Sequence, residues 1–393
     1  MRFRLTYSLA AVLAGAPGAR AAEPIFNVRV LHETRIEMSP DDWQALRDNF
    51  RTNQYYAANV SFDGELVEQV GVRSRGKGSR DETKPGLRLD FNRYGKGRDF
   101  HGMKSAVLDN EIQDTSLLRE ALAYDVFQAM GIPAPQIAYT RVTVNGDYWG
   151  VYAQTEDVRK SFLMERYGEN TGNLFSYAWG GAYDMSWRGE QPEQYVPIPF
   201  EPKTNEDSLD PTELIDFIRA INEAPDATFV NEISNYLDLE KFLTYLAVED
   251  AIAETDGFLG DQGMNNYYLY QHDGSSRFEI IPWDKDTAFQ APAWPLFRGV
   301  EGNLLVTRLL NIEGLRGLYV AAVRRAVKDF VNPRFLTPRL EANYRLIREA
   351  VLQDTKKPYS NDEFELAVVG LRGVIASREQ DVNVQLRATA GRP

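Results

Sequence analysis

Alternating hydrophobic and polar positions in the first half of the chain predict β-strands. Two stretches contain paired alternating runs about a turn, Asp63-Gly64 in one and Asn145-Gly146 in the other, a pattern typical of hairpins. An expected helix at 114–131 separates them, with apolar positions three and four apart. The expected strands and hairpins cover residues 27–38, 55–76, 87–94 and 137–157.

Helical spacing dominates beyond a polar, proline-rich stretch at 198–211. The expected helices cover 211–223, 228–255 and several segments between 304 and 386. One solitary hairpin, 265–283, interrupts them. The pattern predicts an α+β protein with a mixed, strand-rich N-terminal lobe at 22–205. A mainly helical C-terminal lobe, with that hairpin inserted, is expected at 206–393.

The first 21 residues have the layout of a secretory signal peptide. Arg2 and Arg4 precede an apolar run, and Ala19-Arg20-Ala21 matches a cleavage site. No other apolar stretch approaches the ~20 residues of a membrane span, so no stable span is expected. The mature protein is therefore expected to be secreted, periplasmic or at the cell surface.

Composition narrows the chemistry to carboxylates, lysine and arginine. The chain has no cysteine, which excludes disulfides, thiolate metal sites and thiol nucleophiles, and only three scattered histidines, which argue against a histidine-based triad. The formal net charge of −13 disfavours nucleic acid as a partner.

The stretch "IIPWDKDTAF" (280–289) places two aspartates where an apolar strand ends. Pro282 cannot donate to a ladder, so the strand is expected to stop there. If the backbone stays extended, Asp284 and Asp286 point to the same side, about 7 Å apart. Two such carboxylates repel unless a cation lies between them, and Mg²⁺, Mn²⁺ or Ca²⁺ suits oxygen ligands. The alternative is that both aspartates cap a turn or pair with Arg or Lys.

Polar residues upstream of this strand complete a familiar order. An acidic residue on a loop, Asp256 or Asp261, precedes Asn266 at the head of a strand, and Asp284 follows the next strand. Protein kinases arrange their catalytic aspartate, metal-binding asparagine and metal-binding aspartate in this order. The alternative is a set of polar turn residues that flank a hairpin.

A basic, glycine-containing stretch at 71–91 could face phosphates. It contains Arg75, Lys77, Lys84 and Arg88, and its glycines let backbone N–H groups approach an anion. The stretch contains neither a Walker A motif nor G-x-G-x-x-G, and a solvated hairpin end is the more common explanation of such a stretch.

Several segments resemble the CotH family, the spore-coat protein H-like group of atypical kinases. They are "KPGLRLDFNRY", "LREALAYDVFQAMGIPAP", "VNGDYWGVYAQTEDV" and, most specifically, "NNYYLY" followed by "RFEIIPWDKDTAF". The similarity runs from about residue 70 to 290. It implies a bilobal protein kinase-like fold that uses ATP and Mg²⁺ or Mn²⁺ to phosphorylate hydroxyl groups of a secreted or coat protein.

The resemblance also implies roles for individual residues. Asp284 would bind metal with Asp286 beside it, and Asn266 would be the second metal ligand. Asp256, in "TDGF", fits the family's catalytic aspartate, whereas Asp261 has the spacing to Asn266 found in ordinary kinases. The residues expected near the nucleotide are Lys84, Arg88, Arg75 and Lys77, with Glu120 or Glu156 as the partner of a lysine.

Departures from the family pattern keep a second hypothesis open. Lys77 and Gly78 replace family residues in "RGKGS", and Ser176-Tyr177 follow "GNLF" where the family often has lysine. These changes favour a non-catalytic secreted scaffold, such as a coat-assembly module or an adhesin. A third hypothesis is a carbohydrate-active protein, because the aromatic loop at 177–195 could stack on sugar rings.

Overall fold

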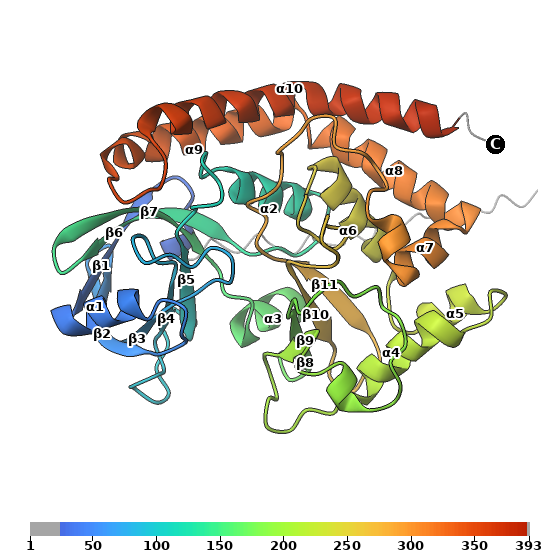
Figure 1. Ribbon diagram of the computed structural model, residues 1–393, viewed down its shortest axis with the longest axis horizontal. Helices are drawn as coiled ribbons and strands as arrows, with labels where there is room; N and C mark the ends of the chain where they lie inside the picture. Colours follow the sequence, from blue (N-terminus) through green and yellow to red (C-terminus); the bar gives the residue numbers. More distant parts are fainter. Residues whose placement is uncertain (1–23, 391–393) are drawn as a thin grey trace, which may run out of the picture.

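Seven strands close into a barrel at one end of the molecule (Figure 1). The computed structural model describes residues 24–390, and the predicted signal peptide at 1–21 lies outside the described residues. The strands are β1 (Leu31–Met38), β2 (Tyr56–Phe62), β3 (Glu65–Ser74), β4 (Leu87–Asp90), β5 (Ser105–Asp109), β6 (Ile137–Val144) and β7 (Asp147–Thr155). Their order is β1-β2-β3-β4-β5-β7-β6, and the parallel pairing of β1 with β6 closes the barrel. Because alternate side chains point inward, apolar residues such as Val60, Val72 and Leu89 fill the interior.

The second sheet has four antiparallel strands in the order β11-β10-β8-β9. They are β8 (Asn173–Tyr177), β9 (Phe200–Pro202), β10 (Tyr267–Gln271) and β11 (Phe278–Pro282). The prediction of a solitary hairpin is therefore wrong, because β10 pairs with β8 from the other side of the proline-rich stretch. β8 and β9 were missed because both are short and pair across a long loop.

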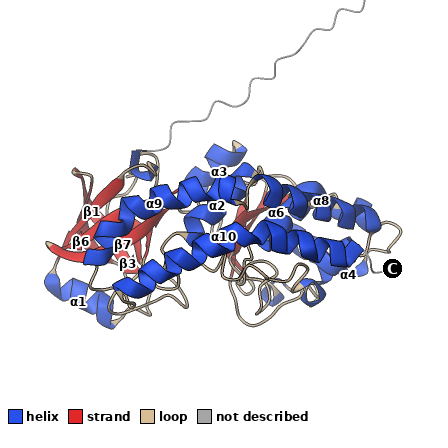
Figure 2. Ribbon diagram, turned by 90° about the horizontal axis from the view of Figure 1, so that it is seen from above, coloured by secondary structure: helices blue, strands red, loops and turns tan. Residues whose placement is uncertain are grey.

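Helices surround the second sheet and extend along the barrel (Figure 2). The shorter ones are α1 (Pro40–Asp48), α2 (Arg119–Ala129), α3 (Lys160–Tyr167), α4 (Thr212–Glu223), α5 (Phe229–Ile233), α6 (Leu239–Ala251) and α7 (Leu304–Leu310). The longer ones are α8 (Glu313–Asp329), α9 (Pro333–Gln353) and α10 (Asn361–Ala390). The protein is thus of the α+β class, in which strands and helices are largely segregated. Among the described residues, no helix is both long and apolar enough to cross a membrane.

The C-terminal helices are attached to both ends of the molecule (Figure 1). Just after α9, Asp354 accepts a 2.8 Å hydrogen bond from Lys84 Nζ, which also donates to the Val151 carbonyl of β7. Along α10, the buried Arg378 guanidinium donates to the carbonyls of Asp250 and Ala251 at the end of α6. These buried contacts hold the barrel and the helical part on either side of a cleft.

Candidate active site

A cleft of about 800 Å³ lies between the end of the β3–β4 connection and the loops around the β10–β11 hairpin. Eight of the eleven residues predicted from the sequence line it, and they come from both ends of the molecule. They are Arg75, Lys77, Arg88, Asp256, Asp261, Asn266, Asp284 and Asp286. The fold therefore brings the predicted acidic and basic groups into one cavity.

The loop between α6 and β10 holds Asp256 through two neighbouring asparagines. The Asn265 side-chain amide donates to both carboxylate oxygens of Asp256, at 3.0 and 3.1 Å, and Asn266 Nδ2 donates to one of them at 3.0 Å. Burial raises the pKa of Asp256, although the Asn265 hydrogen bond opposes the shift. Because the side-chain NH₂ group of Asn266 donates to Asp256, the side-chain oxygen Oδ1 of Asn266 is left to bind a cation.

Asp284 departs from the extended backbone on which the sequence prediction relied. β11 ends at Pro282, as expected, but Asp284 has a φ of +53°, in the left-handed region. Its backbone N–H donates to the Tyr124 hydroxyl of α2 at 3.1 Å, a contact that accompanies the turn. The predicted extended backbone at Asp284 is therefore wrong. Asp284 and Asp286 nevertheless both line the cleft. Such conformations in residues other than glycine concentrate at functional sites.

The two aspartates form an electrostatically unfavourable pair. Burial, and next the Asp109 carboxylate, raise the pKa of Asp284 to about 6, while Arg75 opposes the shift. Burial, followed by the Asp284 charge, raises the pKa of Asp286 well above its ordinary value. Among the described residues, neither carboxylate takes part in a hydrogen bond or an ion pair. A bound cation would relieve this repulsion.

The donors fit a cation that is shared with a substrate better than one caged by protein. Within the described part of the chain, no three His, Cys, Asp or Glu side chains are grouped to hold a metal ion. Mg²⁺ in phosphoryl-transfer sites takes one or two carboxylates and completes its shell with phosphate and water. Asp284 and Asn266, with Asp286 nearby, match that requirement.

Lys285, between the two aspartates, has a positioning role that the sequence analysis did not identify. Its buried Nζ donates to Glu249 Oε1 at 2.7 Å and to the Asn266 carbonyl at 2.9 Å. The other Glu249 oxygen accepts the Phe258 N–H at 2.8 Å. The last turn of α6 is therefore linked to the loop of Asp256 and to the segment of Asp284. A glutamate late in α6 and a lysine in "DKD" gave no separate sequence signal.

The opposite wall of the cleft is cationic, but most of its charges are paired. Arg75 forms an ion pair with Asp109, and Arg88 Nη2 lies 2.5 Å from Asp157 Oδ2. Lys77 forms no ion pair among the described residues, and burial lowers its pKa. Arg73 and Arg80 also line the cleft without an ion pair in the described chain, but their guanidinium groups donate to Asn53 and to backbone carbonyls. Lys77 is therefore the cleft cation that is most available to an anion.

The loop that carries Lys77 is held by Arg80. Gly76 has a φ of +106°, and an added Cβ would lie 2.5 Å from Ser79 Oγ, so glycine is required there. The Arg80 guanidinium donates to the Gly76 carbonyl at 2.6 Å and to the Phe50 carbonyl at 2.9 Å. The glycine-containing loop is thus pinned to the segment after α1.

Three predicted nucleotide-site residues lie outside the cleft lining. Lys84 is buried against Asp354, and in the described structure no hydrogen bond or ion pair joins it to Glu120. Glu156 forms an ion pair with Arg166 at 2.9 Å. The prediction of a Lys84 ion pair with Glu120 or Glu156 is therefore wrong, because Asp354, far along the chain, takes the lysine.

Glu120 is nevertheless linked through Tyr124 to Asp284, the predicted metal ligand. The Tyr124 hydroxyl donates to Glu120 Oε1 at 2.6 Å and accepts the Asp284 N–H. Burial, followed by the Asp284 charge, raises the pKa of Glu120 to about 8, so the carboxyl is largely protonated at neutral pH. Tyr124, one turn after Glu120 on α2, could have been noticed as its helical neighbour.

The structure distinguishes the two candidate catalytic aspartates by their surroundings. Asp256 is hydrogen-bonded to Asn266 inside the cleft, and its charge adds to the repulsion at Asp284. Asp261 is paired with Arg298, and its side chain is 39% exposed. Only Asp256 is directly connected to the predicted metal ligands.

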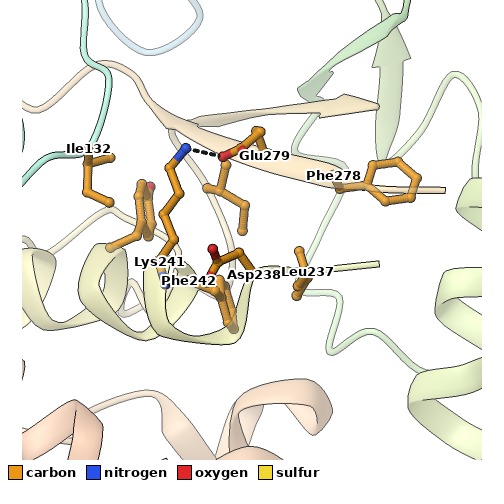
Figure 3. A pocket seen from close by; sticks show the side chains of 9 residues that line it. Ile132, Leu237, Asp238, Lys241, Phe242, Phe278 and Glu279 are labelled. Carbon is orange, nitrogen blue, oxygen red and sulfur yellow. Dashed lines mark hydrogen bonds and ion pairs between the residues drawn. The ribbon is translucent and has the colours of Figure 1, made fainter. Parts of the chain in front are cut away.

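A second pocket lies at the start of α6, and an ion pair in its wall links α6 to β11 (Figure 3). Its volume of about 10 Å³ is at the lower limit for one water molecule. Figure 3 shows Lys241 of α6 reaching Glu279 of β11, with 2.6 Å between Nζ and Oε2. The pocket is too small for a nucleotide, and its ion pair ties the helix before Asp256 to the strand before Asp284.

The chain matches known proteins over most of its length. A model of the family described as CotH kinase protein matches residues 72–382. The chain is 27% identical to inner spore coat protein H of Bacillus subtilis (strain 168) over 338 residues, which cover 84% of this chain and 90% of that protein. It is 22% identical to spore coat protein homolog 1 of Rhizopus delemar over 353 residues, which cover 83% of this chain and 55% of that protein.

A solved structure shows a more distant likeness. The Helicobacter pylori proinflammatory kinase CtkA matches 81% of this chain and 95% of its own chain, with 10% identity and a TM-score of 0.32.

Proposed function

Because this chain belongs to the CotH kinase protein family, we propose that it is an atypical protein kinase that transfers the γ-phosphoryl group of ATP to hydroxyl side chains. The observation that carries the proposal is the meeting of Asp256, Asn266 and Asp284 in one cleft, opposite Lys77, which has no ion-pair partner in the part of the chain that the structure describes. Phosphoryl transfer requires positioning and charge stabilisation, and these groups are suited to both.

Each residue has a distinct part in the proposed reaction. Asp256 orients the acceptor hydroxyl and accepts its proton. Asn266 Oδ1 and Asp284 hold Mg²⁺ or Mn²⁺, with Asp286 adding negative charge beside them. The metal, when bound, neutralises phosphate charge. Lys77 contacts the phosphates from the opposite wall.

The paired arginines have a supporting part in this proposal. Arg75 and Arg88 shape the cationic wall and raise its potential, but their ion pairs leave them less free to bind phosphate than Lys77. Glu120 positions Asp284 through Tyr124 rather than pairing with a lysine.

We further propose a two-lobed, protein kinase-like organisation. The barrel forms the core of the N-terminal lobe, and the four-stranded sheet with its helices forms the C-terminal lobe. Since β8 and β9 pair with β10, a division between β7 and α3 fits the sheet better than one at residue 205.

Export and a secreted or coat-protein acceptor belong to the same proposal. The signal-like sequence at 1–21 and the spore-coat names of the relatives support them.

The competing hypothesis is a scaffold that retains the fold without catalysis. It is favoured by the ion pairs that occupy Arg75 and Arg88 and by the departures at Lys77 and Gly78. The aromatic loop gives little support to carbohydrate binding, because Tyr177, Tyr183 and Tyr195 are buried.

A phosphotransfer assay separates these hypotheses. Residues 22–393 would be incubated with γ-labelled ATP, Mn²⁺ and mixed Ser/Thr peptides, beside Asp256→Asn and Asp261→Asn. We expect label on the peptides with the parent chain and Asp261→Asn, but at least a hundredfold less with Asp256→Asn. No transfer by the parent chain, with or without Mn²⁺, would favour the scaffold.

A further inference from the structure

The segment after β8 lies directly over the loop that carries Asp256. Trp179 Nε1 donates to the Gln262 carbonyl at 3.3 Å. A Cβ added to Gly263 would lie 3.3 Å from Ala182, so the two backbones run close together. Trp179, Gln262 and Asp256 all line the same cleft. The segment is thus part of the cleft wall on the side of the proposed catalytic aspartate.

Two large apolar side chains are exposed at this place, which we term the acceptor rim (Trp179 and Ile198). Trp179 is 43% exposed and Ile198 is 54% exposed. They are neighbours, because a Cβ added to Gly180, next to Trp179, would lie 2.7 Å from Ile198 Cγ2. Most aromatic rings of the 177–195 loop are buried, so the exposure of Trp179 is not a general property of the loop. Exposed apolar groups beside a cleft often mark a binding surface.

The charged groups beside the rim neutralise each other. Lys203 Nζ lies 2.6 Å from Glu201 Oε1, and Arg298 forms an ion pair with Asp261. A charged ligand residue would have to compete with these pairs, whereas an apolar one would cover Trp179 and Ile198 without displacing them. The rim is therefore suited to an uncharged, apolar side chain.

We propose that the acceptor rim binds a peptide segment of the substrate in which a large aliphatic or aromatic residue flanks the phosphorylated Ser or Thr. This inference rests on the proposed kinase function and adds the chemistry of its acceptor. The occupant is a peptide because Trp179 lines the same cleft as Asp256, where the acceptor hydroxyl must lie, and Ile198 lies next to it. The indole, held at Nε1, is a rigid anchor that loses little freedom on binding.

A positional-scanning peptide library tests the inference. Each library fixes one amino acid at one position beside a central Ser/Thr, and γ-labelled ATP with Mn²⁺ reports transfer. The parent chain is expected to select an apolar residue at one flanking position, and Trp179→Ala and Ile198→Ser to lose that selection. KM for the selected peptide should rise about tenfold in Trp179→Ala while kcat is kept, as expected for loss of an aromatic anchor.

Two controls separate this inference from the kinase function. Leu366→Ala removes an apolar side chain that is 67% exposed on α10, outside the cleft lining, and should leave selection unchanged. The melting shift with ATP and Mn²⁺ should be equal in the parent chain and all three variants. Transfer without apolar selection, or unchanged selection in both rim variants, overturns the rim and leaves the kinase function standing. A nucleotide-dependent melting shift without transfer to any peptide overturns the peptide rim, and absence of both overturns the two proposals together.

Discussion

Replacing Asp284 by asparagine should stabilise the free protein and abolish its response to nucleotide. Asparagine keeps the shape of the side chain and the backbone N–H that donates to Tyr124. It removes a carboxylate whose pKa is raised from 3.8 to about 6. One pKa unit corresponds to about 1.4 kcal/mol, so the charge costs of order 1–3 kcal/mol at pH 7.5, allowing for partial exposure.

The expected melting shifts follow from the size of the chain. Unfolding entropies of about 2.1 cal/mol/K per residue give roughly 0.8 kcal/mol/K for a chain of this length. The free Asp284→Asn variant should therefore melt about 1–4 °C above the parent chain. ATP with Mn²⁺ at a hundred times its Kd contributes about 2.7 kcal/mol, a shift of about 3 °C in the parent chain. The variant should lack that shift.

The pH dependence supplies an independent check on the cause. The folded pKa of Asp284 lies above the unfolded value, so its penalty is absent below pH 3.8, grows between 3.8 and about 6, and is complete above. The difference in melting temperature between variant and parent should therefore be larger at pH 7.5 than at pH 5.

The assay is a set of melting curves at both pH values, with and without ATP and Mn²⁺. Asp207→Asn, an exposed aspartate outside the cleft lining, is the matched control and should behave like the parent chain. A variant that melts lower than the parent, or that keeps the nucleotide shift, would refute the reasoning.

The remaining predictions concern three other carboxylates or their partners. Asp256→Asn should keep the ATP–Mn²⁺ melting shift but lower phosphotransfer by at least a hundredfold, and equal loss of both in a folded variant would contradict a role confined to the acceptor hydroxyl. Lys84→Met leaves the Asp354 carboxylate buried without its cation and should cost about 3–5 kcal/mol, or roughly 4–6 °C, with the nucleotide shift unchanged. The double variant Lys84→Met/Asp354→Leu should regain most of that stability, and loss of the nucleotide shift in Lys84→Met would instead place Lys84 at the nucleotide. Since the pKa of Glu120 is raised from 4.5 to about 8, this group makes the free protein less stable as pH rises through that interval. Glu120→Gln should therefore make the melting temperature depend less on pH between 5.5 and 8.5. An unchanged pH dependence would argue against a buried carboxyl that loses its proton in this range.

The local parts of the candidate site could be predicted from the sequence. Asp256, Asn266 and Asp284 belong to one loop–hairpin unit of about 30 residues, so their order limits where the fold can place them. Pro282 ends the second strand of that hairpin, and Asp273-Gly274, a typical turn sequence, lies between its two strands. The left-handed backbone of Asp284, which accompanies a contact with α2, and the role of Lys285 were missed.

The non-local parts could not be predicted, because nothing in a short motif selects a partner far along the chain. Lys84 was assigned to the nucleotide site because of its basic stretch and the family resemblance. Its side chain instead donates to Asp354, 270 positions further along the chain. β8 likewise pairs with β10 across almost a hundred residues, so the hairpin that was predicted to be solitary belongs to a larger sheet. Such pairings depend on the packing of segments that are distant in the chain, not on local sequence.

The charges of the cleft give a reason why the proposed metal and nucleotide would suit this site only together. Asp109 and Asp157 already neutralise Arg75 and Arg88, and Arg73 and Arg80 donate to Asn53 and to backbone carbonyls. Among the described residues, Lys77 is thus the cation of this wall with neither an ion pair nor a side-chain hydrogen bond. The other wall carries Asp284 and Asp286, which form no ion pair within the described part of the chain. A triphosphate alone would add negative charge beside these carboxylates, and a cation alone would find too few protein ligands. The proposed metal–triphosphate complex would supply positive charge at the aspartates and negative charge near Lys77, and would therefore fit both walls at once.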